Sequence, residues 1–203
     1  INNDAPVPSG GAVLVVSLDD SSFDADAGGV GAGAIVGAGL SFASTKVVNT
    51  VESIITGEDT EVAAETSVSV HATLSPSAGA TATGFSVSAF ASASGAVSIA
   101  ESGGKANAAI TGKAKVSGGP VSIRAIADPT LTASSGGLSA SAFAAAGVMI
   151  SETLAGHSAF AEANGSITAS QLDVVANATR TGSADTNFFG ISIQSGEVGF
   201  EAE

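Results

Sequence analysis

The sequence predicts an all-β fold and, within that class, a parallel β-solenoid (β-helix) built from repeats of about 53 residues. Three observations support this prediction. The chain repeats itself, side chains alternate with a period of two inside each repeat, and Gly, Ala, Ser and Thr make up more than half of the 203 residues. Period-two alternation is typical of strands, because successive side chains point to opposite faces. A β-sandwich-like filament subunit is the alternative architecture.

The repeat is clearest in one segment that follows a glycine each time. Residues 85–94 (FSVSAFASAS) resemble residues 138–147 (LSASAFAAAG), and Ile191 begins a further copy of the same segment. Fifty-five positions before Phe85, Val30 also follows a glycine. The prediction is one continuous solenoid domain with a partial repeat at each end: 1–29, then repeats 30–84, 85–137 and 138–190, then 191–203.

Each repeat reads as strand because two faces alternate along it. In the second copy one face is mainly apolar and the other is serine, as in Phe85, Val87, Ala89, Ala91, Ala93, Val97 and Ile99 against Ser86, Ser88, Ser92, Ser94 and Ser98. A second landmark puts Val70, Ile123 and Val174 in one column, which we expect to point inward. Glycine pairs at 103–104, 118–119 and 136–137 favour about three short coils per repeat, with wider coils and longer strands as the alternative.

Composition excludes several classes of function. The absence of Cys rules out disulfides, thiolate metal sites and a Cys nucleophile. The formal net charge of −13 disfavours binding to nucleic acid or to an anionic membrane, and we expect no membrane insertion. Two His and no Tyr leave few acid–base groups, so we expect no enzymatic activity. A polysaccharide-cleaving enzyme is further disfavoured by the scarcity of Arg, Lys and aromatic residues.

Two segments of this chain resemble a known family. Residues 165–179 (GSITASQLDVVANAT) and residues 47–57 (VVNTVESIITG) are similar to recurrent units of the large repetitive bacterial surface proteins known as filamentous adhesins, of the haemagglutinin and leukotoxin type. The resemblance covers most of the chain from about residue 12. It implies secretion, a right-handed parallel β-helix, and a role as a stalk or an adhesive surface.

An acidic cluster supplies the candidate metal ligands. Asp24 and Asp26 lie close to Asp19 and Asp20 in the sequence, and a second acidic loop spans residues 58–61. Calcium prefers several oxygen ligands, so Ca²⁺ held by Asp24 and Asp26 is the functional hypothesis. A solvated acidic turn is the alternative, and no known calcium-loop spacing is present. No catalytic and no cofactor-binding residue is predicted.

Two further groups of residues carry a structural expectation. His71 and His157 share no repeat position, and both are expected at the surface. Ile35, Phe90 and Phe143 occupy equivalent positions and should stack as a ladder, either as a minor core or as an exposed apolar stripe used for association.

The sequence therefore predicts a non-enzymatic structural or adhesive segment of a large secreted or cell-surface bacterial protein, which presents an acidic, Ser/Thr-rich face. The alternative is a subunit that self-assembles into an extracellular filament through open strand edges. The expected partners are other copies or neighbouring repeats of a longer chain, and another cell surface.

Overall fold

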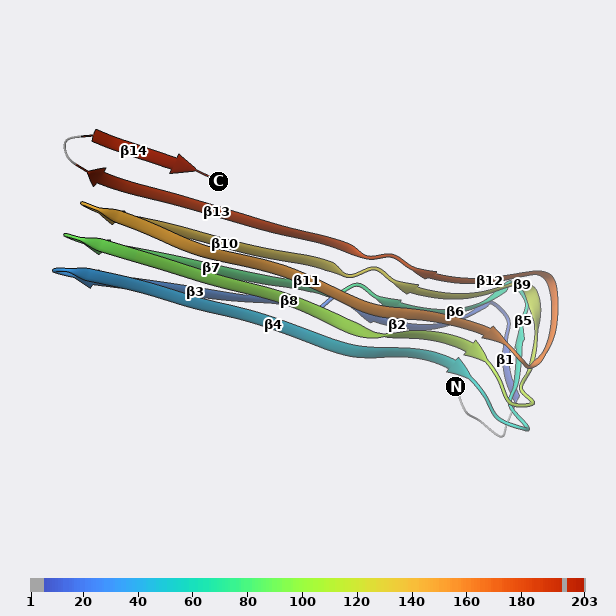
Figure 1. Cartoon of the computed structure of the whole chain (residues 1–203). Coiled ribbons are helices and arrows are strands. Elements are labelled where there is room, and N and C mark those ends of the chain that lie inside the picture. Colours follow the sequence, from blue (N-terminus) through green and yellow to red (C-terminus); the bar gives the residue numbers. More distant parts are fainter. Residues whose placement is uncertain (1–5, 195–196, 203) are drawn as a thin grey trace.

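The protein is all-β, and the computed structural model describes residues 6–194 and 197–202. The described residues contain no helix (Figure 1). The strands are β1 (Pro6–Ser9), β2 (Ala12–Asp19), β3 (Ser22–Gly33), β4 (Val36–Ile55), β5 (Glu61–Ala64), β6 (Ser67–Leu74), β7 (Ser77–Ser88), β8 (Ala91–Ile110), β9 (Lys115–Ala127), β10 (Thr130–Ser141), β11 (Ala144–Ala163), β12 (Ser166–Ala178), β13 (Thr181–Gln194) and β14 (Glu197–Ala202).

Each long strand pairs in parallel with the strand one sequence repeat further on. Ser77 of β7 lies between Ser22 of β3 and Thr130 of β10, and Thr130 lies opposite Thr181 of β13. The same stepping joins β4, β8 and β11 in a second sheet, and β2, β6, β9 and β12 in a third. The predicted all-β, parallel character is confirmed, and the arrangement is compatible with a β-solenoid.

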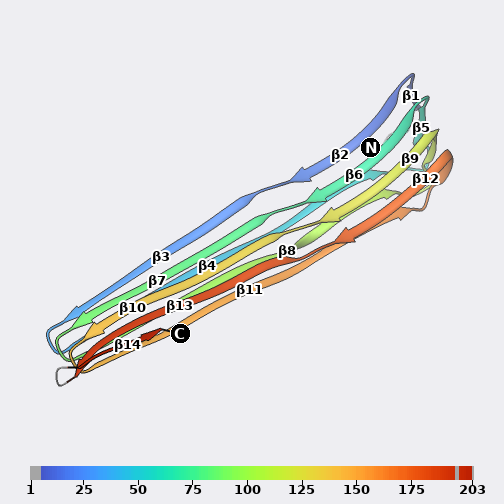
Figure 2. The same ribbon diagram turned by 90° about the horizontal axis from the view of Figure 1, so that it is seen from above.

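The chain runs in long flat circuits. In the second circuit, β6 and β7 lead outward, residues 89–90 turn, β8 returns, and a short third side leads into the next circuit (Figures 1 and 2). The first circuit is 6–55, the second 61–110, the third 115–163, and the fourth, 166–194, is incomplete in the described residues. We call the end with the short third side the base, and the end with the two-residue turns the tip.

One circuit therefore uses a whole repeat, and the expectation of three short coils per repeat is wrong. Strand β8 continues straight through Gly103 and Gly104, and β10 continues through Gly136 and Gly137. A 53-residue loop would enclose too much space if it were round. This loop is flattened until its two long sides touch, so no wide interior has to be filled.

The base holds an aliphatic core. Its largest side chains are fully buried and come from the circuits stacked between the first and the third, among them Ile55, Val68, Val70, Leu74, Ile110, Val116, Val121 and Ile123. The column predicted to point inward does so at Val70 and Ile123, whereas Val174 in the last circuit is 41% exposed. Burial of these apolar side chains is the main stabilising contribution at this end.

The glycines of the base turns have a local role. Gly57 and Gly112 adopt positive φ values of 132° and 69° where β4 and β8 end, a backbone conformation that favours glycine. They stand at equivalent places in the first two corners of the base, so this turn is built in the same way twice.

Towards the tip the two layers approach until only small residues fit between them. Alanines fill the middle, including Ala80, Ala82 and Ala96. Nearer the turn, a Cβ on Gly84 would stand 2.6 Å from the carbonyl oxygen of Gly95 on the opposite layer. The interior there is made of serines instead of aliphatic side chains, namely Ser86, Ser88, Ser92, Ser94, Ser98, Ser135, Ser139 and Ser141.

The buried serines of the tip bond to one another and to backbone. The Ser139 hydroxyl lies 3.0 Å from that of Ser86 and 2.7 Å from that of Ser92, and so joins two strands of one layer to the other layer. Ser88 and Ser141 donate to the carbonyl oxygens of Ala91 and Ala144 across the turn. A buried hydroxyl with a partner avoids most of its desolvation penalty, which makes a polar interior tolerable here.

The predicted outward Ser/Thr-rich face is therefore wrong at the tip, where serines point inward and the apolar set points outward. Val30 is 79% exposed, and Leu40, Phe42 and Val148 are exposed too. The alternation is as expected, but the faces are reversed, because the gap between the layers is too thin for Phe or Leu. The register of the last repeat also differs: Leu138 lies opposite Phe189, and Ile191 lies opposite Ala140.

Candidate functional site

The two predicted calcium ligands lie on one strand and face solvent. Asp24 and Asp26 are exposed neighbours on the outer face of β3, opposite Gly79 and Thr81 of β7. The Asp24 carboxylate leans over Gly79, where a methyl group would touch it. Within the described part of the chain, no three His, Cys, Asp or Glu side chains gather in a way that could hold a metal ion. Calcium at this pair stays a prediction, and melting the chelated protein with and without millimolar Ca²⁺ tests it.

The remaining acids of the cluster are engaged in local structure. Asp19 ends β2, and its carboxylate accepts a hydrogen bond from the backbone N–H of Ser21 at 2.9 Å and another from the Asn49 amide. The Ser21 backbone bond is the main reason that the pKa of Asp19 lies below its usual value. In the second acidic loop, Glu58 pairs with Lys113 at 2.7 Å, and both side chains are exposed. These contacts fasten turns and form no ligand shell.

His157 is the one described ionisable side chain that lies deep in the interior, at 4% exposure, so its expected surface position is wrong. It points inward from β11 at the boundary between the aliphatic base and the alanine middle. Its Nε2 lies 3.0 Å from the Ser102 hydroxyl, while Nδ1 is buried without a hydrogen-bond partner. Burial lowers the pKa of His157, and the nearby positive charge of Arg180 lowers it further.

His71 faces outward from β6, as expected, with Nε2 3.4 Å from the Ser122 hydroxyl. Across the repeat it lies opposite Val16 and Arg124, so it is one member of a mixed surface column. Nothing in the described chain places a nucleophile and an oriented base around either histidine. Neither arrangement resembles a catalytic constellation.

The predicted ladder at the tip turn exists and is exposed. The rings of Phe90 and Phe143 stack with centroids 4.5 Å apart and planes tilted by 36°. The two side chains are 51% and 50% exposed, and Ile35 at the equivalent position is 69% exposed. The ladder is therefore a contact between circuits that also leaves an apolar stripe in solvent.

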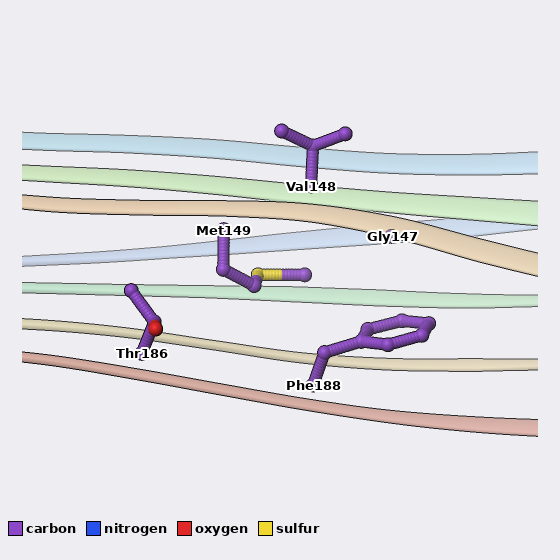
Figure 3. Close-up of a pocket in the computed structure, with 5 residues that line it drawn as sticks. All are labelled: Gly147, Val148, Met149, Thr186 and Phe188. Carbon is purple, nitrogen blue, oxygen red and sulfur yellow. The ribbon is translucent and has the colours of Figure 1, made fainter. Parts of the chain in front are cut away.

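A shallow groove of about 350 Å³ opens between β11 and β13 (Figure 3). Met149 and Phe188 lie in it with Thr186, while Val148 points away, and the Phe188 ring rests over Gly147 where a Cβ would collide with it. Its lining residues carry no ionisable side chain. The groove therefore offers apolar contact and no acid–base chemistry.

The feature that sequence reasoning missed is a continuous apolar surface on the sheet β4–β8–β11. Its outward positions in the tip half are all apolar residues or glycine, aligned in register across the three strands: Val36, Ala38, Leu40 and Phe42, then Ala91, Ala93, Gly95 and Val97, then Ala144, Ala146, Val148 and Ile150. We call these twelve residues the apolar face. The period-two pattern contains this set, but only the thickness of the tip decides that it points outward.

The described residues include no helix long and apolar enough to cross a membrane. The geometry thus offers broad surfaces, short turn contacts and one buried histidine, with no assembled reactive centre among the described residues. No family model, no curated protein and no solved structure matches this chain.

Proposed function

We propose that the chain is a segment of a β-solenoid in a large secreted or cell-surface bacterial protein, with a non-enzymatic structural and adhesive role. The single observation that supports this most is the register. Every long strand pairs with its counterpart one repeat later, from β3 through β7 and β10 to β13. A chain that stacks on itself in this way extends by adding repeats, and its stability accumulates from nearest neighbours.

Of the two roles, a contact surface fits the dimensions better than a stalk. Each added circuit uses about 53 residues and lengthens the stack by only one strand spacing, about 4.8 Å. The same circuit adds an arm of twenty residues, such as β8, which spans about 66 Å at roughly 3.3 Å per residue. The fold therefore gains little reach per residue and gains much exposed area.

An adhesion assay tests this role directly. Beads coated with the folded chain are mixed with bacterial and animal cells, and retention is measured by flow cytometry. We expect retention on at least one cell type, well above beads that carry heat-denatured chain. If folded and denatured chains are retained equally, the adhesive role is wrong. Small-angle scattering of the same sample should give a flat particle about 70 Å long.

The second candidate is a subunit that polymerises through its strand edges. Among the described residues, β2, β3 and β4 have a partner on one side only, and so do β11 and β12 at the other end of the stack. Unpaired edges are templates for strand addition. If copies join in this way, concentrated protein forms fibres, and Leu14→Lys on β2 together with Leu172→Lys on β12 should suppress them. A particle that never forms fibres contradicts this candidate.

A further inference from the structure

The apolar face is unusual in a chain that carries 19 acidic and 6 basic residues. None of its twelve outward residues is ionisable, and the strand next to each of them is held in register by parallel pairing. Leu40 is 76% exposed, and Phe42, Val148 and Val36 are each more than 60% exposed. Contiguous apolar surface of this kind on a soluble protein marks an interaction site.

We propose that this face binds a second copy of the same chain, so that two sheets β4–β8–β11 pack face to face in a closed dimer. The proposal concerns an interface that the proposed adhesive role does not require, and each can fail without the other. Two observations favour a second copy as the occupant: the available area and the self-complementary relief of the face.

The area matches what a stable dimer buries. Three strands about 4.8 Å apart and twenty residues long, at about 3.3 Å per residue, make a flat face of roughly 900 Å². A standard interface buries about 800 Å² on each partner. The apolar face fills the tip half of this area, and the base half supplies a more polar rim, which includes the pair Lys46–Glu101.

The relief of the face suits a two-fold axis that lies in the interface, perpendicular to the strands. One row across the sheet is Leu40, Gly95 and Val148, low in the middle and high at both sides. The next row is Phe42, Val97 and Ile150, which is high throughout. An axis between the two rows places Val97 of each copy over Gly95 of the other, as a closed, isologous contact requires.

The same axis keeps like charges apart. Because residues on one side of the axis face residues on the other side, Glu101 of one copy lies over Ala91 of its partner, and Glu152 lies over Ala146. The acids of the two copies then occupy opposite ends of the interface, where water and counter-ions screen them. The net charge of −13 therefore does not prevent association through this face.

Sedimentation velocity of the full chain across a concentration series tests the dimer. We expect a monomer–dimer equilibrium with a dissociation constant on the order of micromolar. Leu40→Asp should weaken it at least tenfold, because the carboxylate would be buried without a partner. The matched control is Leu14→Asp, the same change at a similarly exposed leucine that lies outside the apolar face, and it should leave the constant within about threefold.

A composition-preserving swap tests the orientation. Gly95→Val should weaken the dimer at least tenfold, because Val would then face Val. The fold tolerates it, since a Cβ at this position meets only the flexible end of Leu40, at 2.8 Å. Adding Val97→Gly should return the dissociation constant to within about threefold of wild type, since bump and hollow are then exchanged on both copies. Far-UV circular dichroism verifies that each variant is folded.

The other outcomes overturn the proposal. A chain that stays monomeric up to about millimolar concentration has no such interface. Equal weakening by Leu14→Asp and Leu40→Asp, or no effect of Gly95→Val, places association elsewhere. Fibres that persist in Leu40→Asp identify the strand edges as the contact. A monomer that binds neutral phosphatidylcholine vesicles, and loses this binding in Leu40→Asp, assigns the face to lipid.

Discussion

The base and the tip are built from the same repeat and the same strands, yet they use opposite solutions. At the base, large aliphatic side chains such as Ile123 and Leu74 are fully buried. At the tip, serines such as Ser86 and Ser139 are fully buried, while Val30 and Leu40 face solvent. The difference is the separation of the layers, which the short third side holds open at the base and which closes to backbone contact at the tip.

The comparison teaches that alternation alone does not decide which face is inside. A wide gap selects the apolar set, because its burial is favourable. A gap that admits only a hydroxymethyl group selects serine, provided that each hydroxyl finds a partner. The base should therefore carry most of the stability, whereas the tip should be sensitive to added volume.

The largest expected difference is in the loss of buried aliphatic volume. Ile123→Ala at the base should lower the free energy of unfolding by about 2–4 kcal/mol, because it removes a fully buried side chain and leaves a cavity. The same change at the tip, Ile35→Ala, removes a side chain that is largely exposed and should cost less than about 0.5 kcal/mol. Urea unfolding measures both, and equal effects would contradict the contrast between base and tip.

Adding volume to the tip should give the next largest effect. Gly84→Ala places a methyl group 2.6 Å from the carbonyl oxygen of Gly95 and should cost about 1–3 kcal/mol, because backbone has to move. Gly28→Ala, also on β3–β7 surface but with nothing within 4 Å of the new Cβ, is the control and should be neutral. Thermal unfolding compares them. A neutral Gly84→Ala would mean that the layers are further apart than described.

Removing one hydroxyl from the serine interior should have an intermediate cost. Ser139→Ala leaves the hydroxyls of Ser86 and Ser92 without their shared partner and should destabilise by about 1–2 kcal/mol. Ser158→Ala on the exposed side of β11 should change stability by less than about 0.5 kcal/mol. Stabilisation by Ser139→Ala would show that the hydroxyl network is dispensable.

His157, at the boundary between base and middle, predicts a pH effect. Because its folded-state pKa lies below the model value of 6.5, the unfolded state binds more protons in the interval between the two pKa values. Stability should therefore fall as pH drops through 6.5 and level off below the folded-state pKa. Melting temperatures of wild type and His157→Gln between about pH 8 and pH 5 measure this, and identical curves would contradict it.

The smallest effect is expected from the surface ion pair Lys46–Glu101, which joins β4 to β8 at 2.7 Å with both side chains substantially exposed. Glu101→Gln should cost less than about 0.5 kcal/mol, and the loss should shrink further in high salt. Urea unfolding at low and high ionic strength measures it. A loss above about 1 kcal/mol would mean that the pair is shielded from water.

Sequence reasoning recovered the strands, their parallel pairing and the spacing of the repeat, because these follow from periodicity. It placed Val70 and Ile123 inside correctly, since large β-branched residues in one column need a core. It missed the buried His157 and the outward direction of Leu40 and Phe42, because both depend on how close the two layers come. That distance is set by glycines on facing strands, whose partners no single strand pattern identifies.

The corner of the base also determines where this molecule can change length. The connection from β4 to β5 covers residues 56–60, the equivalent one from β8 to β9 covers 111–114, and that from β11 to β12 covers 164–165. The long arms keep their register through these changes, so the corners absorb every difference between the first three steps of the stack. A peptide inserted at 111–114 would therefore project from one edge, whereas the turn at 89–90 has no comparable freedom. Engineering of this scaffold can proceed from that edge without disturbing either broad surface.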